Sequence, residues 1–276
     1  GLMLLVYAMT RATTDGWGSA STLGLIGASA ALIAAFVAIE FRSKAALLPP
    51  RIFRARQLVA ANATMAIVGA VAFSEFFVLT LYLQDVLHYS PMRSGVAFIA
   101  FALTVVAISN VAQWIVGRVG VSATLTAGLL SSTASVALLT RLPLHGSYFW
   151  DLFPAFVLGG AGMALSFVPV TIASLTGVQP ADAGIASGLV NTSRQIGGAI
   201  GLAAVSAIAT SSSSSYLHAH SIVAPGAALD HGIQTSLYAL TGVLVLGVLI
   251  AAFLVRPQQR PAPVEAAHEP ELAEAA

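Results

Sequence analysis

Glu75 is the residue of this chain best suited to chemistry, because it is an acid deep inside the apolar segment 58–84. It lies about four residues, or about 6 Å along a helix, from the middle of that segment. A charged carboxylate at the centre of a membrane costs about 2.5–3.5 kcal/mol, so we expect the side chain to face a bundle interior or a wet cavity. The position predicts a proton carrier. The alternative is an acid that stays protonated or pairs with a hydroxyl such as that of Tyr82.

Arg194 is a cation whose depth depends on where its helix enters the membrane. If the span begins two residues later, Arg194 is a surface anchor; if it begins near Gly184, the guanidinium lies about 12 Å inside and must line a cavity or pair. Asn191, Gln195 and Gly198 follow at i, i+4 and i+7, so they share a helix face. They predict a polar stripe that points into the bundle, with hydrogen bonding between helices as the alternative.

Asn110 and Gln113 are a second pair of polar residues inside an apolar segment, 94–117. On one helix, a spacing of three brings two side chains to the same face. We therefore expect these two amides to line a polar pathway. Hydrogen-bonded packing between helices is the alternative.

Glycines and one proline indicate where helices pack or bend. Gly184 and Gly188, and again Gly197 and Gly201, are separated by three residues, and such pairs of small residues let neighbouring membrane helices approach closely. Pro169, late in a long apolar segment, removes one backbone hydrogen bond and bends its helix. A bent helix suits the wall of a gated cavity, and a tolerated kink is the alternative.

The residue types that enzymes and nucleic-acid-binding proteins use are missing or scattered. The chain has no cysteine, and its 6 histidines form no HExxH pair, so neither pattern predicts a metal site. The glycines of 159–162 lack the preceding strand of a dinucleotide-binding loop. A net charge of +1 without a basic block offers nothing to phosphates. We therefore predict no enzyme activity, no catalytic site, no metal, no cofactor and no nucleic-acid partner.

The elements that must position these residues are membrane-spanning helices. Only 8% of the residues are charged, and the mean hydropathy is +0.87, whereas a soluble domain has about 25% charged residues. A helix needs about 20 apolar residues to cross a membrane. The sequence therefore predicts an all-α, polytopic transmembrane helical bundle. Its expected spans are 1–12 (truncated), 21–40, 58–84, 94–117, 121–141, 149–176, 185–210 and 233–255.

The loop Phe41–Gln57 sets the predicted orientation, because it is rich in Lys and Arg and short basic loops stay in the cytoplasm. Threading from this loop places the C-terminus in the cytoplasm and a long polar loop, Ser211–Gly232, outside. The predicted units are 1–57, which holds the truncated span, a linker span and the basic loop; 58–255, a six-span bundle; and 256–276, a disordered cytoplasmic tail.

Three segments resemble one family of transporters, the fourteen-span EmrB/QacA-type drug:proton antiporters of the major facilitator superfamily. Segment 47–54 (LLPPRIFR) is similar to the loop before the family's ninth span, and 81–91 (LYLQDVLHYSP) is similar to the turn after it. Segment 183–201 (AGIASGLVNTSRQIGGAIG) is similar to the signature of the thirteenth span. The resemblance covers about residues 1–256 and implies the C-terminal part of such a protein, with the linker helices before a six-helix bundle.

The resemblance implies secondary active transport, in which two bundles rock around a central cavity, here a proton-coupled multidrug efflux antiporter of the plasma membrane. The implied partners are membrane lipid, a hydrophobic small-molecule substrate, protons and an N-terminal six-span half that is absent from this chain. Two departures stand out: segment 185–210 has no acid, and Glu75 stands where an apolar residue is expected. A major facilitator permease for a metabolite is the alternative within transport. A non-transporting membrane scaffold or a membrane-embedded enzyme is the alternative of another class.

Overall fold

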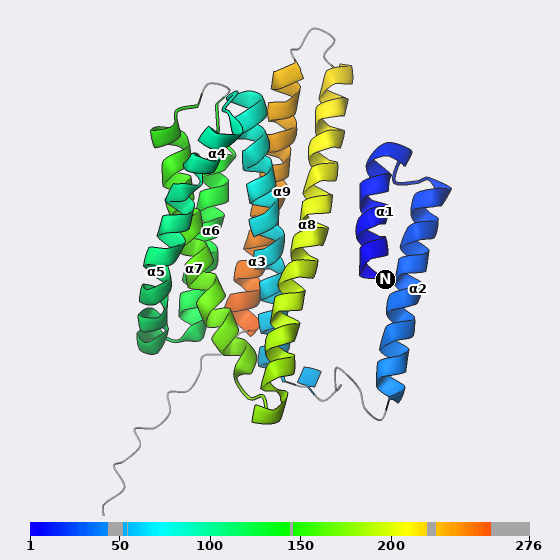
Figure 1. The fold of residues 1–276 in the computed structure, drawn as a ribbon, viewed down its shortest axis with the longest axis vertical. Coiled ribbons are helices and arrows are strands. Elements are labelled where there is room, and N and C mark those ends of the chain that lie inside the picture. Colours follow the sequence, from blue (N-terminus) through cyan, green and yellow to red (C-terminus); the bar gives the residue numbers. More distant parts are fainter. Residues whose placement is uncertain (44–51, 54, 144–145, 220–224, 255–276) are drawn as a thin grey trace, which may run out of the picture.

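The computed structural model describes residues 1–43, 52–53, 55–143, 146–219 and 225–254, and all regular secondary structure in these ranges is helical (Figure 1). Most of the predicted basic loop and the whole predicted tail, 256–276, lie outside the described residues. The α-helices are α1 (Leu2–Asp15), α2 (Ala20–Arg42), α3 (Arg56–Leu81), α4 (Pro91–Ala97), α5 (Ile99–Val119), α6 (Val121–Leu139), α7 (Phe153–Leu175), α8 (Ala183–Ala219) and α9 (Pro225–Leu254). Short helices of other types are η2 (Tyr82–Val86), η3 (Tyr148–Leu152) and η4 (Pro180–Asp182).

Seven helical segments in the described part of the chain are long and apolar enough to cross a membrane. They are Ala20–Arg42, Arg56–Val86, Pro91–Val119, Val121–Leu139, Tyr148–Leu175, Pro180–Ala219 and Gly226–Ala252. Each overlaps one of the expected full spans, and α1 is a shorter apolar helix at the expected truncated span. The predicted all-α transmembrane bundle is therefore confirmed.

The long polar loop predicted over Ser211–Gly232 is wrong. α8 continues as a helix to Ala219, and α9 begins well before the predicted end of the loop. Near this end the ring of Tyr216 stacks on that of His231, with the ring centres 4.5 Å apart. Contacts between the two helices thus extend both of them beyond their apolar segments, which the distribution of hydrophobic residues alone does not reveal.

α3 is the central helix of the bundle (Figure 1). It packs against α7, α8 and α9, while α6 packs against α7 and α9. The hairpin of α1 and α2 reaches the bundle through contacts of α1 with α8. The C-terminal ends of α2, α5, α7 and α9 all lie at the same end of the bundle (Figure 1). The predicted threading places the segments that follow these helices on one side of the membrane, in agreement with this arrangement.

The core of the bundle is apolar, and so is much of its outer surface. Fully or almost fully buried side chains from α3 to α9 meet at the centre, among them Leu79, Leu125, Leu129, Phe156 and Leu237. Large exposed apolar side chains cover the outside of α5 and α9, among them Leu103, Val106, Leu246 and Leu249. Such a surface is unfavourable in water by about 25 cal/mol per Å², whereas lipid solvates it readily because every helical backbone group is already hydrogen-bonded.

Two pairs of an arginine and an aromatic ring lie at opposite ends of the segment Pro91–Val119. The guanidinium of Arg118 lies 3.6 Å from the ring centre of Trp114, and that of Arg93 lies 3.8 Å from the ring centre of Tyr89. Aromatic rings and long cationic side chains favour the boundary between lipid and water. Their separation along the segment agrees with a helix that crosses a membrane.

Candidate functional site

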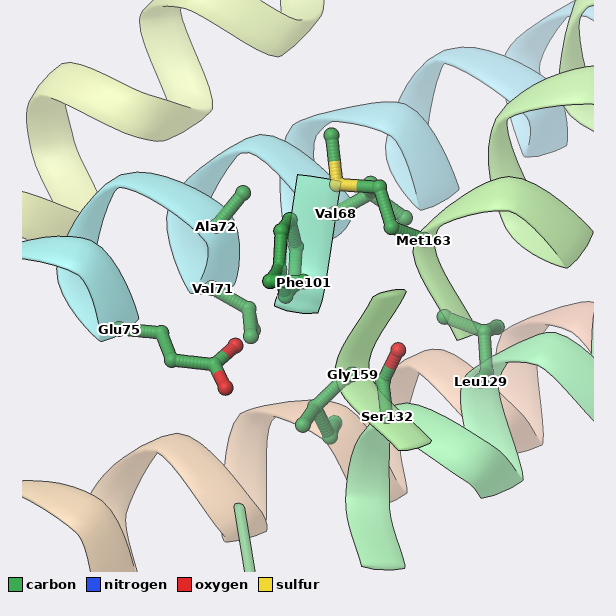
Figure 2. Close-up of a pocket in the computed structure, with 10 residues that line it drawn as sticks. Val68, Val71, Ala72, Glu75, Phe101, Leu129, Ser132, Gly159 and Met163 are labelled. Carbon is green, nitrogen blue, oxygen red and sulfur yellow. The ribbon is translucent and has the colours of Figure 1, made fainter. Parts of the chain in front are cut away.

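The side chain of Glu75 extends from α3 into the interior of the bundle (Figure 2). It is 7% exposed, although α3 also has faces that lie on the surface. Tyr82, the alternative partner, begins η2 directly after α3, and its hydroxyl donates to the backbone carbonyl of Pro143 at 2.6 Å. The structure therefore places the acid in the interior, where a proton carrier is expected, and gives Tyr82 a different partner.

In the described part of the chain, one hydroxyl group contacts the carboxyl group of Glu75. The Oγ of Ser135 on α6 lies 3.4 Å from Glu75 Oε1, and it also donates to the backbone carbonyl of Ala155 on α7 at 2.7 Å. Gly159, one turn further along α7, leaves the space that both side chains occupy: a Cβ there would lie 2.9 Å from Ser135 Oγ and 3.4 Å from Glu75 Oε1. Three helices therefore meet at this acid.

A small cavity lies beside the carboxyl group, between α3, α5, α6, α7 and α9 (Figure 2). Apart from Glu75 and Ser132, its lining is apolar or glycine: Val68, Val71, Ala72, Phe101, Leu129, Gly159, Met163 and Leu244. Its volume is about 20 Å³, and one buried water molecule needs about 10–15 Å³. The cavity therefore has room for a water molecule and is too small for a drug-sized compound. The described residues hold no group of three or more His, Cys, Asp or Glu side chains placed to bind a metal ion.

Gly197 and Gly201 lie where α8 packs closely against α3. A Cβ on Gly197 would overlap the backbone carbonyl of Ala66, and a Cβ on Gly201 would lie 2.6 Å from the Cα of Ala70. Neither contact has room for a side chain. The second predicted pair of small residues thus lies in a helix contact.

Gly184 and Gly188, the first predicted pair, meet open space. On the same helix Ala186 and Val190 are buried, and a residue two positions away points to the opposite side, because each residue turns a helix by about 100°. The described part of the chain therefore leaves this pair uncovered. Pro169 is buried inside α7, and the helix continues past it.

Arg194 lies about 16 Å along α8, which begins at Ala183, and because α8 is longer than a membrane core is thick, both predicted depths of Arg194 stay predictions. Its Nη2 donates to Asn191 Oδ1 at 3.1 Å, and its Nε is buried without a hydrogen-bond partner among the described residues. Asn191 and Gln195 are exposed, whereas Gly198 is buried. The predicted stripe does not point into this bundle as a unit, because α8 turns glycine rather than amide side chains toward α3.

Asn110 and Gln113 are exposed on α5. Like the exposed amides of α8, they lie on a surface that the described helices leave uncovered. The structure therefore separates the sequence-predicted residues into two groups. Glu75 is enclosed within the bundle, and the four amides are on its outside.

Nothing in the sequence identifies Ser135 and Gly159 as neighbours of the acid, or Ser132 as a residue that lines the cavity beside it. The contact between Ser135 and Glu75 joins residues that are 60 positions apart, and its existence depends on how α3, α6 and α7 are aligned. One weaker signal is present. Gly128 and the serines of α6 recur at helical spacing, and Gly162 of α7 packs directly against Gly128 and Ser132, as small residues do where membrane helices approach closely.

Residues 1–202 match the family model described as Major Facilitator Superfamily. The chain is 32% identical to the puromycin resistance protein pur8 of Streptomyces alboniger over 261 residues, which cover 92% of this chain and 52% of that protein. It is 33% identical to the cephamycin export protein CmcT of Amycolatopsis lactamdurans over 78% of this chain and 44% of that protein. It is 29% identical to the tetracenomycin C resistance and export protein of Streptomyces glaucescens over 76% of this chain and 39% of that protein. The chain spans about half the length, or less, of these relatives.

Proposed function

This chain belongs to the major facilitator superfamily, and from that premise we propose that it forms the C-terminal part of a secondary transporter that exports antibiotic-like organic molecules in exchange for protons. The observation that carries the proposal is the similarity, along 92% of the chain, to a protein named for puromycin resistance. Relatives named for the export of cephamycin and of tetracenomycin C support the same class of activity. Because the chain spans about half of these proteins, the activity is proposed for the whole protein, with an N-terminal half as its partner.

Glu75 is the proposed proton carrier of this half. A carboxyl group in a membrane interior is neutral when it holds a proton and unfavourable when it does not, so its charge state changes the free energy of the surrounding bundle. Burial at 7% exposure, a serine hydroxyl at 3.4 Å and a cavity with room for one water molecule support this role. These features supply a proton acceptor, a hydrogen-bond partner and space for the molecule that delivers the proton.

The exported molecule would bind outside this bundle, between it and the rest of the protein. The cavity beside Glu75 is too small for an organic substrate, whereas the amides of Asn110, Gln113, Asn191 and Gln195 are exposed and free to line a larger pathway. Their scarcity among apolar side chains favours a hydrophobic substrate over a polar metabolite. We place the protein in the plasma membrane as a carrier rather than an enzyme, with its C-terminus in the cytoplasm.

Transport of a fluorescent cation tests the proposal. In cells that carry the full-length protein, ethidium should accumulate less than in cells with an empty vector, and collapse of the proton gradient should abolish the difference. Glu75→Gln should remove the dependence on the proton gradient. Glu40→Gln, the same change near the end of α2, is the matched control and should leave it intact. Equal accumulation in protein-bearing and empty-vector cells, with and without the gradient, would reject export of this class of compound.

A further inference from the structure

Ser135 has one hydroxyl hydrogen and two acceptors within reach. Its Oγ lies 2.7 Å from the backbone oxygen of Ala155 and 3.4 Å from Glu75 Oε1. Hydrogen bonds between oxygens are strong at about 2.5–3.0 Å and weak beyond that range. In this structure the hydrogen therefore belongs to the bond with Ala155, which links α6 to α7.

This arrangement suits a protonated Glu75. A protonated carboxyl group carries its own donor and can direct it to the lone pairs of Ser135 Oγ, whereas a carboxylate can only accept. Ser135 itself is outside the cavity lining, in which Ser132 carries a hydroxyl donor, and none of the residues that α5, α6, α7 and α9 contribute to that lining is titratable or charged. When Glu75 loses its proton, the nearest donor is the hydroxyl of Ser135, which must turn away from Ala155 to reach it.

We propose that Ser135 is a positioning residue that transmits the charge state of Glu75 from α3 to α7, by exchanging its hydrogen bond with Ala155 for one with the carboxylate. The inference rests on the proposed role of Glu75 as a proton carrier. It adds a residue whose hydrogen bond changes with the charge of Glu75. With the proton bound, Ser135 holds α7 against α6. With the proton released, that link opens and the hydroxyl stabilises the carboxylate instead.

The loss of the hydrogen bond between Ser135 and Ala155 has a local effect, because a neighbouring hydrogen bond between α6 and α7 stays in place. Ser131, one turn before Ser135 on α6, donates to the backbone carbonyl of Leu158 at 2.8 Å and, among the described residues, makes no hydrogen bond with the acid. α7 would therefore remain attached at Leu158 while it is released at Ala155. Gly159 lies against both Ser135 and Glu75, so this turn of α7 is in direct contact with the change of partner.

Infrared difference spectroscopy of the full-length protein in lipid tests the exchange directly. Titration should reveal a carboxylic acid C=O band that Glu75→Gln removes and that is thereby assigned to Glu75. Ser135→Ala should move this band to higher wavenumber, because the protonated acid loses its hydrogen-bond partner. Ser131→Ala, which removes an equivalent bond between the same helices, should leave the band in place. An unmoved band in Ser135→Ala, or an equal movement in Ser131→Ala, overturns the proposal.

Transport measurements separate this inference from the proposed function. Ser135→Ala should slow proton-driven ethidium exchange by about tenfold, the effect expected from losing one hydrogen bond to a charged group, and Ser131→Ala should slow it by less than about twofold. If Ser135→Ala does not fold, Gly159→Ala replaces it, because the added methyl displaces Ser135 from Glu75 while the hydroxyl is retained. If Glu75→Gln leaves proton coupling unchanged, the proposed function of Glu75 fails. If Glu75→Gln uncouples transport and Ser135→Ala behaves like Ser131→Ala, only the role of Ser135 is wrong.

Discussion

Replacing Gly197 with alanine should weaken the contact between α8 and α3. The new methyl group would overlap the backbone carbonyl of Ala66, which cannot move unless α3 itself moves. Adding a methyl group to a filled contact costs about 1–3 kcal/mol. Alanine also stabilises a helix interior by about 0.5–1 kcal/mol relative to glycine, so the net effect of this variant alone is the difference between two opposing terms.

Comparison with Gly188→Ala separates the steric cost from the gain in helix stability. It makes the same chemical change on the same helix at a position that meets open space, so only the gain in helix stability remains. Subtracting the two variants cancels that gain and leaves about 1–3 kcal/mol, or about a 5- to 150-fold change in the ratio of folded to unfolded protein. Gly242→Ala on α9, which also meets open space, is a second control on another helix.

The measurement is reversible unfolding of the purified full-length protein in mixed micelles with increasing sodium dodecyl sulfate, followed by tryptophan fluorescence. Gly197→Ala should unfold at a lower detergent fraction than either control. Equal midpoints for Gly197→Ala and Gly242→Ala would refute the close approach of α8 to α3. A loss of stability in Gly188→Ala with Gly242→Ala unaffected would assign Gly188 a contact with the rest of the full-length protein, and the comparison of Gly197 with Gly242 would still decide the question.

Three further predictions concern the ends of the helices. Tyr82→Phe should destabilise the protein by about 0.5–1.5 kcal/mol in the same unfolding assay, because the hydrogen bond from the Tyr82 hydroxyl to the Pro143 carbonyl is lost; an unchanged midpoint contradicts this. A hydrogen bond from Arg11 lowers the pKa of the Asp15 carboxyl, so the ion pair is present above the ordinary pKa of an aspartate and is lost as the pH falls through the lowered value. Arg11→Gln should therefore raise the titration midpoint of Asp15 measured by carbon NMR, and an unmoved midpoint would show that the bond is not formed. This chain has no cysteine, so in a full-length protein whose remaining part is also made cysteine-free, an impermeant maleimide should label Gly18→Cys and Gln179→Cys from opposite sides of sealed vesicles, with Gln179→Cys on the cytoplasmic side. Labelling of both from one side would contradict the predicted threading.

The spans could be predicted because they depend on local composition and length, which a membrane of fixed thickness constrains strongly. The ends of α8 and α9 could not, since contacts such as that of Tyr216 with His231 extend the helices beyond their apolar segments. The orientation of Glu75 follows from the cost of a charge in lipid. Its partner Ser135 does not, because that contact depends on the alignment of helices that are distant in the sequence.

Identical spacing also has different consequences on the two halves of α8. The pair at Gly184 and Gly188 and the pair at Gly197 and Gly201 have the same pattern, but only the second contacts α3. The pattern shows that a helix can be approached closely, and the crossing point of the two helices decides where the approach occurs. A single sequence contains the first kind of information and not the second.

α3 lies between Glu75 and the region of α8 around Arg194, and this position limits how a proton and a substrate could affect each other. Gly69 of α3 lies against the backbone of Arg194 on α8, while Glu75, on another face of α3, contacts Ser135 of α6. A proton on Glu75 and a substrate near the exposed amides of α8 would therefore be separated by the body of α3, and direct competition for one site is not available to them. In the proposed antiport, coupling would instead pass through a displacement of packed helices. The close contact of α3 with the glycines of α8, and the change of hydrogen bonds proposed between α3, α6 and α7, place that displacement at α3.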